Sequence, residues 1–221
     1  MIECRNLGKS YGTVQAVTEI SLSLDEHEFL SILGPSGCGK STLLRLIAGL
    51  EVPSQGQVFL HGQEISGRKI ILPPEHRKFG MIFQDFALFP HLSVKDNVRY
   101  GTTGSKKEKQ QRVHELLELV SLPHLATKMP HQISGGEQQR IAVARALAPR
   151  PRLILMDEPF SNLDYQLRQQ LRRDIREILK HEGVATVLVT HDQVEAITFS
   201  DRMLLIQKGK VVQEGTPLEI Y

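Results

Sequence analysis

A glycine-rich loop between two apolar segments constrains the fold of this chain more than any other feature. Residues 34–42 read GPSGCGKST. The run Phe29–Leu33 before them is typical of a strand, and residues 43–48 after them have a helical pattern that ends at Gly49. Strand, glycine loop and helix in this order form the context in which G-x-x-x-x-G-K-[ST] indicates a phosphate-binding loop. The sequence therefore predicts that the chain binds a nucleotide.

Each residue type in this loop has a physical reason to be there. Gly34 and Gly39 permit backbone angles that other residues resist, so that successive N–H groups can turn towards phosphate oxygens. The helix that follows adds the partial positive charge of its N-terminus. We expect Lys40 to reach the β- and γ-phosphates of ATP and Ser41 to ligate Mg²⁺. The candidate nucleotide-binding residues of the loop are Gly34, Pro35, Ser36, Gly37, Cys38, Gly39, Lys40, Ser41 and Thr42.

Composition excludes several classes of protein. Of 221 residues, 40% are hydrophobic and 24% are charged, which is ordinary for a soluble globular protein. The net charge of +2 is too balanced to predict a nucleic-acid surface. No apolar run approaches the roughly 18 residues of a membrane span, and the N-terminus lacks the apolar segment of a secretory signal. We expect a reduced, cytoplasmic protein without a nucleic-acid partner.

The two cysteines make no disulfide framework, and one of them lies inside the loop. Two interpretations of Cys38 stay open. Because the loop uses its backbone, the thiol can serve packing alone. Alternatively, Lys40 and the helix N-terminus make the thiol reactive.

Hydrophobic periodicity changes twice along the chain. The first thirty residues predict strands with a turn at residues 11–12, and residues 57–60 and 80–83 predict further strands, with a loop at the Pro73-Pro74 pair between them. Residues 93–148 read as mostly helical and include a capping box that starts at Ser105.

After Pro149 the hydrophobic pattern changes from helical spacing back to runs typical of strands. Residues 153–156 and 185–190 are apolar runs, as expected of strands buried on both faces. Between them a helix is predicted from about Asp164 to His181, with its arginines as exposed charge, and residues 203–214 predict a hairpin. Residues 216–219 open a helix that the chain leaves incomplete at Tyr221, so we expect a piece of a longer protein.

Two carboxylates end the apolar run at residues 153–156. Asp157 suits a position next to the direct ligands of a Mg²⁺ ion, and Glu158 could polarise an attacking water. An acidic pair at a strand end is common by itself. In a chain that also has a phosphate loop, the pair favours nucleotide hydrolysis.

The segment Ile133-Ser134-Gly135-Gly136-Glu137 opens a predicted helix over residues 137–147. Its N–H groups and the Ser134 hydroxyl predict a second anion site at a helix N-terminus. With this segment, the chain resembles the nucleotide-binding subunits of ATP-binding cassette (ABC) transporters, whose signature is usually Leu-Ser-Gly-Gly-Gln. It departs from that signature at Ile133, a volume-conserving change, and at Glu137, which places a carboxylate near a phosphate site.

The resemblance covers essentially the whole chain and implies further roles. It implies that Tyr11 stacks on adenine, that Gln84 contacts Mg²⁺ and water, and that His191 contacts the γ-phosphate. Taken alone, these residues would instead be a turn aromatic, an edge polar residue and a surface histidine. The loop 161–164, with Asn162 where alanine is commoner, matches the segment that crosses the dimer. The implied catalytic residues are Lys40, Gln84, Glu158 and His191; the metal ligands Ser41, Gln84 and Asp157; and the further nucleotide contacts Tyr11, Ser134, Gly135, Gly136 and Asp164.

The resemblance also implies an architecture and a mechanism. It implies an α/β P-loop NTPase with a mainly parallel central sheet, an N-terminal antiparallel β-subdomain and an inserted helical subdomain at about residues 85–150. Residues 1–84 and 151–221 would form the core, and a C-terminal regulatory domain would lie outside this chain. Two copies would meet head to tail with ATP between the phosphate loop of one and the signature of the other. Glu158 would then be the general base and His191 a geometric clamp.

The resemblance also implies partners. A separate transmembrane permease would dock beside residues 86–92, and a solute-binding protein would take part indirectly, with the chain held on the cytoplasmic side of the membrane. The stretches around residues 73–77 and 84–91 resemble binding-protein-dependent importers, and we expect ferric iron as the solute. Polyamine, maltodextrin, sulfate and thiamine importers are alternatives. So are a soluble cassette ATPase acting on DNA or ribosomes, and a cassette that binds ATP without hydrolysing it.

Overall fold

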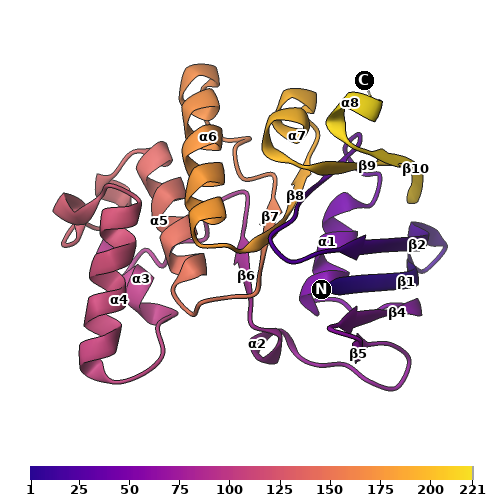
Figure 1. The fold of residues 1–221 in the computed structure, drawn as a ribbon, viewed down its shortest axis with the longest axis horizontal. Coiled ribbons are helices and arrows are strands. Elements are labelled where there is room, and N and C mark those ends of the chain that lie inside the picture. The colour runs from indigo at the N-terminus through magenta and orange to yellow at the C-terminus, as the bar shows by residue number, and fades with distance from the viewer. Residues whose placement is uncertain (221) are drawn as a thin grey trace.

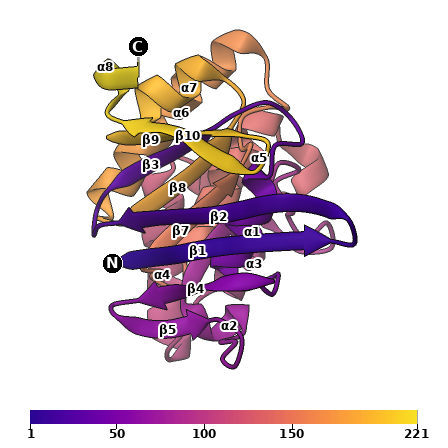
Figure 2. The same cartoon turned by 90° about the vertical axis from the view of Figure 1, so that its right-hand side faces the viewer.

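The computed structural model describes residues 1–220, and Tyr221 lies outside the described residues. An antiparallel sheet carries the N-terminus, with the strand order β2-β1-β4-β5 (Figure 2). The turn after Tyr11 predicted from the sequence joins its two longest strands. Its members are β1 (Ile2–Tyr11), β2 (Val14–Leu24), β4 (Gln55–Leu60) and β5 (Gln63–Ser66).

A second sheet forms the centre of the molecule, with the order β10-β9-β3-β8-β7-β6. Its neighbouring strands are parallel except for the β9–β10 hairpin. The α/β fold with a mainly parallel sheet and an antiparallel β-subdomain is therefore confirmed. The strands are β3 (Phe29–Leu33), β6 (Phe79–Ile82), β7 (Leu153–Asp157), β8 (Ala185–Thr190), β9 (Arg202–Gln207) and β10 (Lys210–Gly215).

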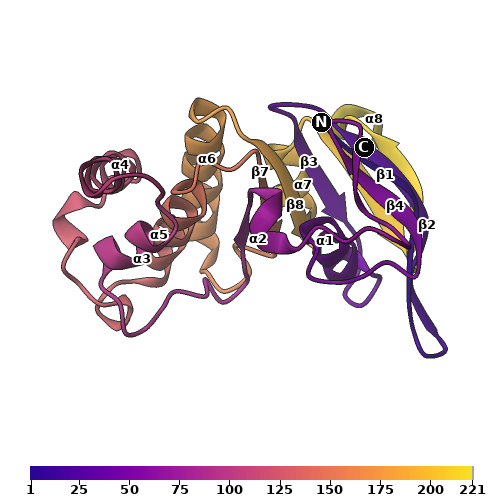
Figure 3. The same cartoon turned by 90° about the horizontal axis from the view of Figure 1, so that it is seen from below.

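Helices cover both faces of the central sheet (Figures 1 and 3). The first, α1, lies between the two sheets, whereas α5 and α6 cover the opposite face and α3 and α4 lie beyond them (Figure 3). The helices are α1 (Lys40–Ala48), α2 (Pro74–Arg77), α3 (Val94–Tyr100), α4 (Lys106–Leu119), α5 (Gly135–Leu147), α6 (Tyr165–His181), α7 (Gln193–Phe199) and α8 (Pro217–Ile220), with 3-10 turns at Pro123–Leu125 and Pro130–Gln132.

Strand β7 shows why an apolar run without alternation becomes a central strand. Leu153 and Leu155 belong to the core around α1, whereas Ile154 and Met156 belong to the core around α5 and α6. Both faces are thus buried, as the sequence predicted. The exposed fraction of all four side chains is zero.

Several boundaries differ from the sequence-based expectation. The Pro73-Pro74 pair opens the short helix α2 and not only a loop, because proline is favoured in the first helical turn. Strand β6 ends at Ile82, one residue earlier than predicted. Helix α7 has no counterpart in the prediction, and its seven residues are too few to show a clear period. The capping box at Ser105 and Glu108 and the opening helix at Pro217 are confirmed.

Arg77 is the largest fully buried side chain. Its guanidinium donates to the carbonyls of Ile47 at 2.8 Å, Leu72 at 2.8 Å and Ile65 at 3.2 Å. These acceptors come from the end of α1, the segment before α2 and β5. Arg77 therefore fixes the C-terminal end of α1 to the antiparallel sheet, and burial lowers its pKa to about 10.

The expectation that the α6 arginines are exposed charge is wrong for Arg172, whose exposed fraction is 4%. Arg168 and Arg176 are also partly covered, since each donates to backbone carbonyls of neighbouring segments. Arg173 alone among the four is exposed. The apolar face of α6, made of leucines and isoleucines, was predicted correctly. This pattern does not indicate which groups the polar side chains of the helix contact.

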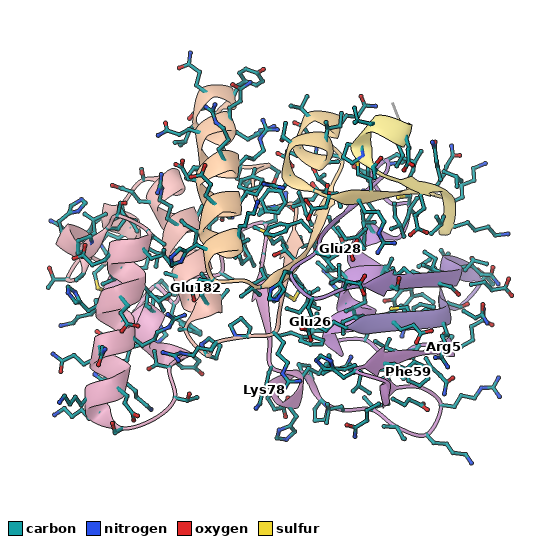
Figure 4. The ribbon with its side chains drawn as sticks, in the orientation of Figure 1. Arg5, Glu26, Glu28, Phe59, Lys78 and Glu182 are labelled. Atoms are coloured by element: carbon teal, nitrogen blue, oxygen red, sulfur yellow. The ribbon has the colours of Figure 1, made fainter. Side chains whose placement is uncertain are left out.

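Charged side chains join segments that are distant in sequence. Arg202 of β9 donates to Glu28 at 2.7 Å, and Arg112 of α4 donates to Glu182 after α6 at 2.6 Å. Glu28 and Glu182 are labelled in Figure 4, as are Arg5 and Phe59, whose guanidinium carbon and ring centroid lie 4.3 Å apart on the antiparallel sheet.

Both cysteines are free and buried. Burial raises the pKa of the Cys4 thiol to about 12, so that it stays neutral in the core. Within residues 1–220 no helix is long and apolar enough to cross a bilayer.

Candidate nucleotide site

Four segments singled out from the sequence follow the C-terminal ends of adjacent strands. In the parallel register Leu33 pairs with Thr190, Val189 with Asp157, and Met156 with Ile82. The segments after β3, β8, β7 and β6 therefore lie along one edge of the sheet. This carboxyl edge is where open α/β sheets bind ligands.

Glycines shape the loop between β3 and α1, and of the two expected positions Gly39 is confirmed and Gly34 is not. Gly37 and Gly39 have positive φ angles of 78° and 106°, in the region that favours glycine. Gly34 has no positive φ, so the reason predicted for it is wrong. A side chain at Gly34 would meet the Ile206 carbonyl of β9, and one at Gly39 would meet the Ala16 carbonyl of β2. Gly34 is thus explained by the close approach of two backbones.

Lys40 is the first residue of α1 and is buried. Its ammonium donates to the carbonyls of Gly34 at 2.8 Å and Pro35 at 2.9 Å, across the mouth of the loop. Gly39 provides no side-chain cap, and the first turn of α1 has no acidic residue. The loop therefore offers backbone N–H groups, a helix N-terminus and one ammonium, all of which attract phosphate.

Ser41, next in α1, reaches across to β7. Its hydroxyl donates a 2.8 Å hydrogen bond to Asp157 Oδ1. Burial raises the pKa of the Asp157 carboxyl, an effect that the Ser41 hydrogen bond opposes. A hydroxyl and a carboxylate beside a phosphate-binding loop are hard oxygen donors, and they fit Mg²⁺, which is usually held by one or two carboxylates together with phosphates.

Glu158 and His191 meet at the ends of β7 and β8. Glu158 has a φ of 46°, and its N–H donates to the Val189 carbonyl at 2.9 Å. His191 Nδ1 lies 2.9 Å from Glu158 Oε2. The Glu158 side chain is 19% exposed and that of His191 is 51% exposed, so the pair lies at the rim of the site.

Gln84 follows β6 after one intervening residue and is exposed. Its carbonyl accepts a 2.9 Å hydrogen bond from Asn162 Nδ2, which joins the segments after β6 and β7. Asp164 caps α6, because its carboxylate accepts from the Leu167 N–H at 3.0 Å. The structure thus brings Gln84, Asn162 and Glu158 to one edge, whereas the Asp164 side chain is engaged in its own helix.

Residues 134–136 lie beside the segments after β7 and β6, because a side chain at Gly135 would meet Leu163 and approach Phe86. Helix α5 begins at Gly135, earlier than the predicted 137, with Ser134 as its N-cap. Both Ser134 donors are used within the chain, since its N–H and hydroxyl donate to Glu137 Oε2 at 2.7 and 2.8 Å. These hydrogen bonds lower the pKa of Glu137. The N–H groups of Gly135 and Gly136 remain at the open helix end, while α1 lies across the sheet (Figure 1).

Tyr11 and Cys38 are the remaining candidates. Tyr11 is 45% exposed at the end of β1, and Lys9 Nζ lies 5.0 Å from its ring centroid. The hairpin that carries Tyr11 reaches the loop through Ala16. Cys38 is 6% exposed and belongs to the core around α1, which supports the interpretation of its thiol as a packing group.

A family model described as ABC transporter matches residues 17–161. The chain belongs to the ABC transporter family. This matched range contains the loop, residues 134–136 and the Asp157–Glu158 pair, whereas His191 lies beyond it.

Curated relatives agree with this assignment. The chain is 49% identical to a Pseudomonas fluorescens protein named as an Fe(3+) ions import ATP-binding protein, FbpC, over all of this chain and 62% of that relative. It is 46% identical to a spermidine/putrescine import ATP-binding protein, PotA, of Mesorhizobium japonicum, over all of this chain and 61% of that one. The cassette therefore spans about three fifths of the length of these relatives.

Solved cassettes have the same fold. A dimeric structure of the ATP-binding cassette MJ0796 in a post-hydrolysis state with ADP and Pi has a TM-score of 0.83 and 32% identity, covering 98% of this chain and 99% of that one. The protein cbiO1 of Clostridium perfringens, part of the ABC transporter complex cbiONQ, has a TM-score of 0.90 and 28% identity, covering 99% and 89%.

Sequence reasoning missed several residues of this site. Asn162 was noted only for replacing a commoner alanine, and Arg168 was expected to be solvated. Arg145 of α5 was not considered, although it donates to the carbonyls of Phe86 and Ala87 in the segment after Gln84. No sequence signal identifies these contacts, because each joins a side chain to a backbone carbonyl of a distant or irregular segment.

Proposed function

We propose that this cassette hydrolyses ATP with Mg²⁺ and so powers solute import by an ABC transporter. The observation that carries the proposal is the arrangement at one sheet edge of the phosphate-type loop, the Ser41–Asp157 hydrogen bond and the Glu158–His191 pair. The names of the relatives support ATP-driven import, and the structural neighbour with ADP and Pi supports hydrolysis by this fold.

In this proposal the loop N–H groups and Lys40 bind the triphosphate and offset the charge that develops during transfer. Ser41, Asp157 and Gln84 would hold Mg²⁺, which neutralises phosphate charge when bound. Glu158 orients water and accepts its proton. His191 holds the Glu158 carboxylate in place through the contact of its Nδ1 with Oε2. Tyr11 supplies an aromatic face for adenine.

A second copy of the chain completes the site in this proposal. The helix end at residues 134–136 and the loop of the same chain lie on opposite sides of the sheet, so they do not face a single nucleotide (Figures 1 and 3). A head-to-tail homodimer would place Gly135 and Gly136 of one copy against the γ-phosphate bound by the other, with Asp164 and its loop at the junction. ATP would then join the copies, and hydrolysis would release them.

We further propose that the cassette works on the cytoplasmic side of the membrane, bound to separate permease subunits, with a solute-binding protein acting indirectly. The segment after Gln84, held by Arg145, is the proposed permease contact. Ferric iron is the solute that we favour, because the FbpC relative has the higher identity of the two import proteins described above. Polyamine import is the second candidate. Residues 85–150 would form the helical subdomain.

The test has two parts. Purified protein is assayed for ATP hydrolysis and for nucleotide binding, with the Lys40→Ala variant as the binding control. Hydrolysis by the wild type and loss of ATP binding in the variant would support the site, whereas tight ATP binding by Lys40→Ala would show that the loop has another role.

The second part identifies partners. The tagged chain is recovered from its host in mild detergent, its partners are identified, and ATPase activity is measured with ferric iron or spermidine and the matching binding protein. A complex with two permease subunits, whose ATPase rises with one solute, would support import and name the solute. A soluble complex without a membrane protein would contradict the transport proposal, whereas the assignment of the chain as an ABC cassette would stand.

A further inference from the structure

Arg168 occupies a position where its charge is unfavourable by itself. It lies in the first turn of α6, and the positive end of a helix dipole repels a cation. Its side chain nevertheless folds back over the helix end, where Nη2 donates to the carbonyls of Leu163 at 2.9 Å and Ser161 at 3.3 Å. Only 22% of the side chain is exposed. These contacts show that Arg168 is engaged with the segment before α6.

The second contact of Arg168 is with the segment that carries His191. Arg168 Nη1 lies 3.6 Å from Asp192 Oδ2, and the Asp192 side chain is 27% exposed. The other Asp192 oxygen caps α7 by accepting from the Glu195 N–H at 3.1 Å. Asp192 therefore uses one oxygen for its own helix and the other for the ion pair.

These contacts close a ring. Ser161 Oγ donates to the Glu158 carbonyl at 3.0 Å, and His191 Nδ1 lies 2.9 Å from Glu158 Oε2. The contacts run from Glu158 to Ser161, then to Arg168 and on to Asp192. Asp192 is bonded to His191 in the chain, and the His191 ring contacts Glu158 again. Arg168 is the member that spans the gap between the segments after β7 and β8.

Other contacts hold the backbone of this region without Arg168. Thr190 Oγ1 accepts from the Asp192 N–H at 3.0 Å and donates to Glu195 Oε2 at 2.6 Å. Glu195 is buried, and burial raises the pKa of its carboxyl. Loss of Arg168 would therefore loosen the position of residues 191–192 without removing the anchor of β8.

We propose that Arg168 is a positioning residue that ties Asp192 to residues 161–163 and thereby fixes the His191 imidazole beside Glu158. The role extends to Gln84, because Asn162 in the same segment donates to its carbonyl. The inference rests on the proposed ATP hydrolysis for its kinetic consequence, but the placement of His191 can be measured without it.

The variants are chosen to separate positioning from folding. Arg168→Met removes the charge and the fork of donors, whereas Arg168→Lys keeps the charge but cannot span both carbonyls and Asp192. Asp192→Asn removes the ion pair yet can still cap α7, since asparagine caps as well as aspartate. Arg173→Met is the matched control, because Arg173 is an exposed arginine of the same helix.

The kinetic readout is kcat and KM for ATP. We expect Arg168→Met and Asp192→Asn each to lower kcat by roughly 10-fold to 100-fold, as small displacements of catalytic groups do, with KM within about twofold. The double variant should be no slower than the slower single variant, Arg168→Lys should recover part of the loss, and Arg173→Met should match the wild type.

The direct readout is the NMR signal of the His191 ring, assigned by its loss in His191→Gln. We expect this signal to move in both Arg168→Met and Asp192→Asn and to stay in place in Arg173→Met. An unchanged kcat and an unmoved His191 signal in Asp192→Asn would overturn the proposal, even if Arg168→Met fails to fold. So would a double variant whose loss of kcat equals the product of the losses in Arg168→Met and Asp192→Asn. A wild type that hydrolyses no ATP would overturn the proposed function instead, and the His191 signal would still decide the positioning role.

Discussion

The Ser41 hydroxyl donates to Asp157 Oδ1 at 2.8 Å and so joins the first turn of α1 to the end of β7. These residues are 116 positions apart in the chain. Because parallel pairing of β3, β8 and β7 sets the distance between them, the hydrogen bond depends on the register of the whole sheet. The local loop motif and a distant strand end thus form one oxygen-donor pair.

Removing the Ser41 hydroxyl should weaken the response of the protein to Mg²⁺. Ser41→Ala deletes one proposed ligand and frees Asp157 to turn, so we expect the Mg²⁺ concentration for half-maximal ATPase to rise about 10-fold to 100-fold. Nucleotide binding without Mg²⁺ should not change, because the loop N–H groups and Lys40 remain. Titration of Mg²⁺ at saturating ATP measures the first quantity, and an unchanged titration would remove Ser41 from the metal site.

Asp157 should lower stability at neutral pH. Burial raises the pKa of this carboxyl in the folded protein, so the folded state binds the proton more tightly than the unfolded state. Its contribution is therefore most favourable below the unfolded pKa and is lost as pH rises through the folded pKa. Asp157→Asn removes this loss, and we expect a higher Tm at pH 7 than the wild type but nearly the same Tm at acidic pH.

The same variant should lose activity. An amide cannot replace the negative charge proposed to face Mg²⁺, so the gain in Tm should accompany a large fall in kcat. Thermal unfolding at several pH values and one ATPase assay check both statements. A lower Tm at neutral pH would mean that the hydrogen bond from Ser41 outweighs the cost of burial.

Glu158→Gln should separate ATP binding from hydrolysis. The amide keeps the shape of the side chain and removes the base, so turnover should fall by about 10² to 10⁴. ATP with Mg²⁺ should then trap a dimer that size-exclusion chromatography detects. Glu177→Gln on the exposed face of α6 is the matched control. Hydrolysis at near the wild-type rate would contradict the assignment of Glu158 as the base.

The sequence was informative where one local segment carries the whole signal. The loop, the buried run of β7 and the capping box at Ser105 each follow from fewer than ten consecutive residues, and each was predicted. Parallel order then placed the strand ends on one edge. The candidate residues after β3, β6, β7 and β8 were predicted one by one or through the family resemblance, and the register of the structure groups them.

Contacts between distant polar groups could not be predicted in this way. Arg77 and Arg172 are buried, although arginine is seldom fully buried unless it is paired. Asn162 donates to a carbonyl 78 residues away. A periodic pattern separates the apolar face of a helix from its polar face, but it does not say which carbonyl the polar face meets. Long-range packing decides that.

Arg77→Met should lower stability more than an exposed substitution. The change leaves the carbonyls of Ile47, Ile65 and Leu72 without their donor in a buried site, which costs about 3 kcal/mol or more. For a domain of this size we expect Tm to fall by roughly 10 °C. Arg68→Met, at an exposed position, is the control. Equal Tm values for the two variants would show that Arg77 does not anchor α1.

The carboxylate of Glu137 should oppose ATP-driven pairing of two cassettes. It accepts from the Ser134 N–H and hydroxyl, which lowers its pKa, so it stays ionised at neutral pH beside the helix end proposed to face the partner's γ-phosphate. Because glutamine also completes a capping box, Glu137→Gln should keep the helix end and remove the charge. We expect the ATP concentration for half-maximal activity or dimer formation to fall a few-fold.

The pH dependence of stability distinguishes the two roles of this carboxylate. A lowered folded pKa means that Glu137 contributes stability above its unfolded pKa near 4.5 and that this contribution is lost as pH falls through the folded value. Glu137→Gln should lack that part of the acid dependence. If the variant changes the acid dependence of Tm but leaves the ATP dependence of dimer formation unaltered, Glu137 caps α5 and does not face the nucleotide of a partner.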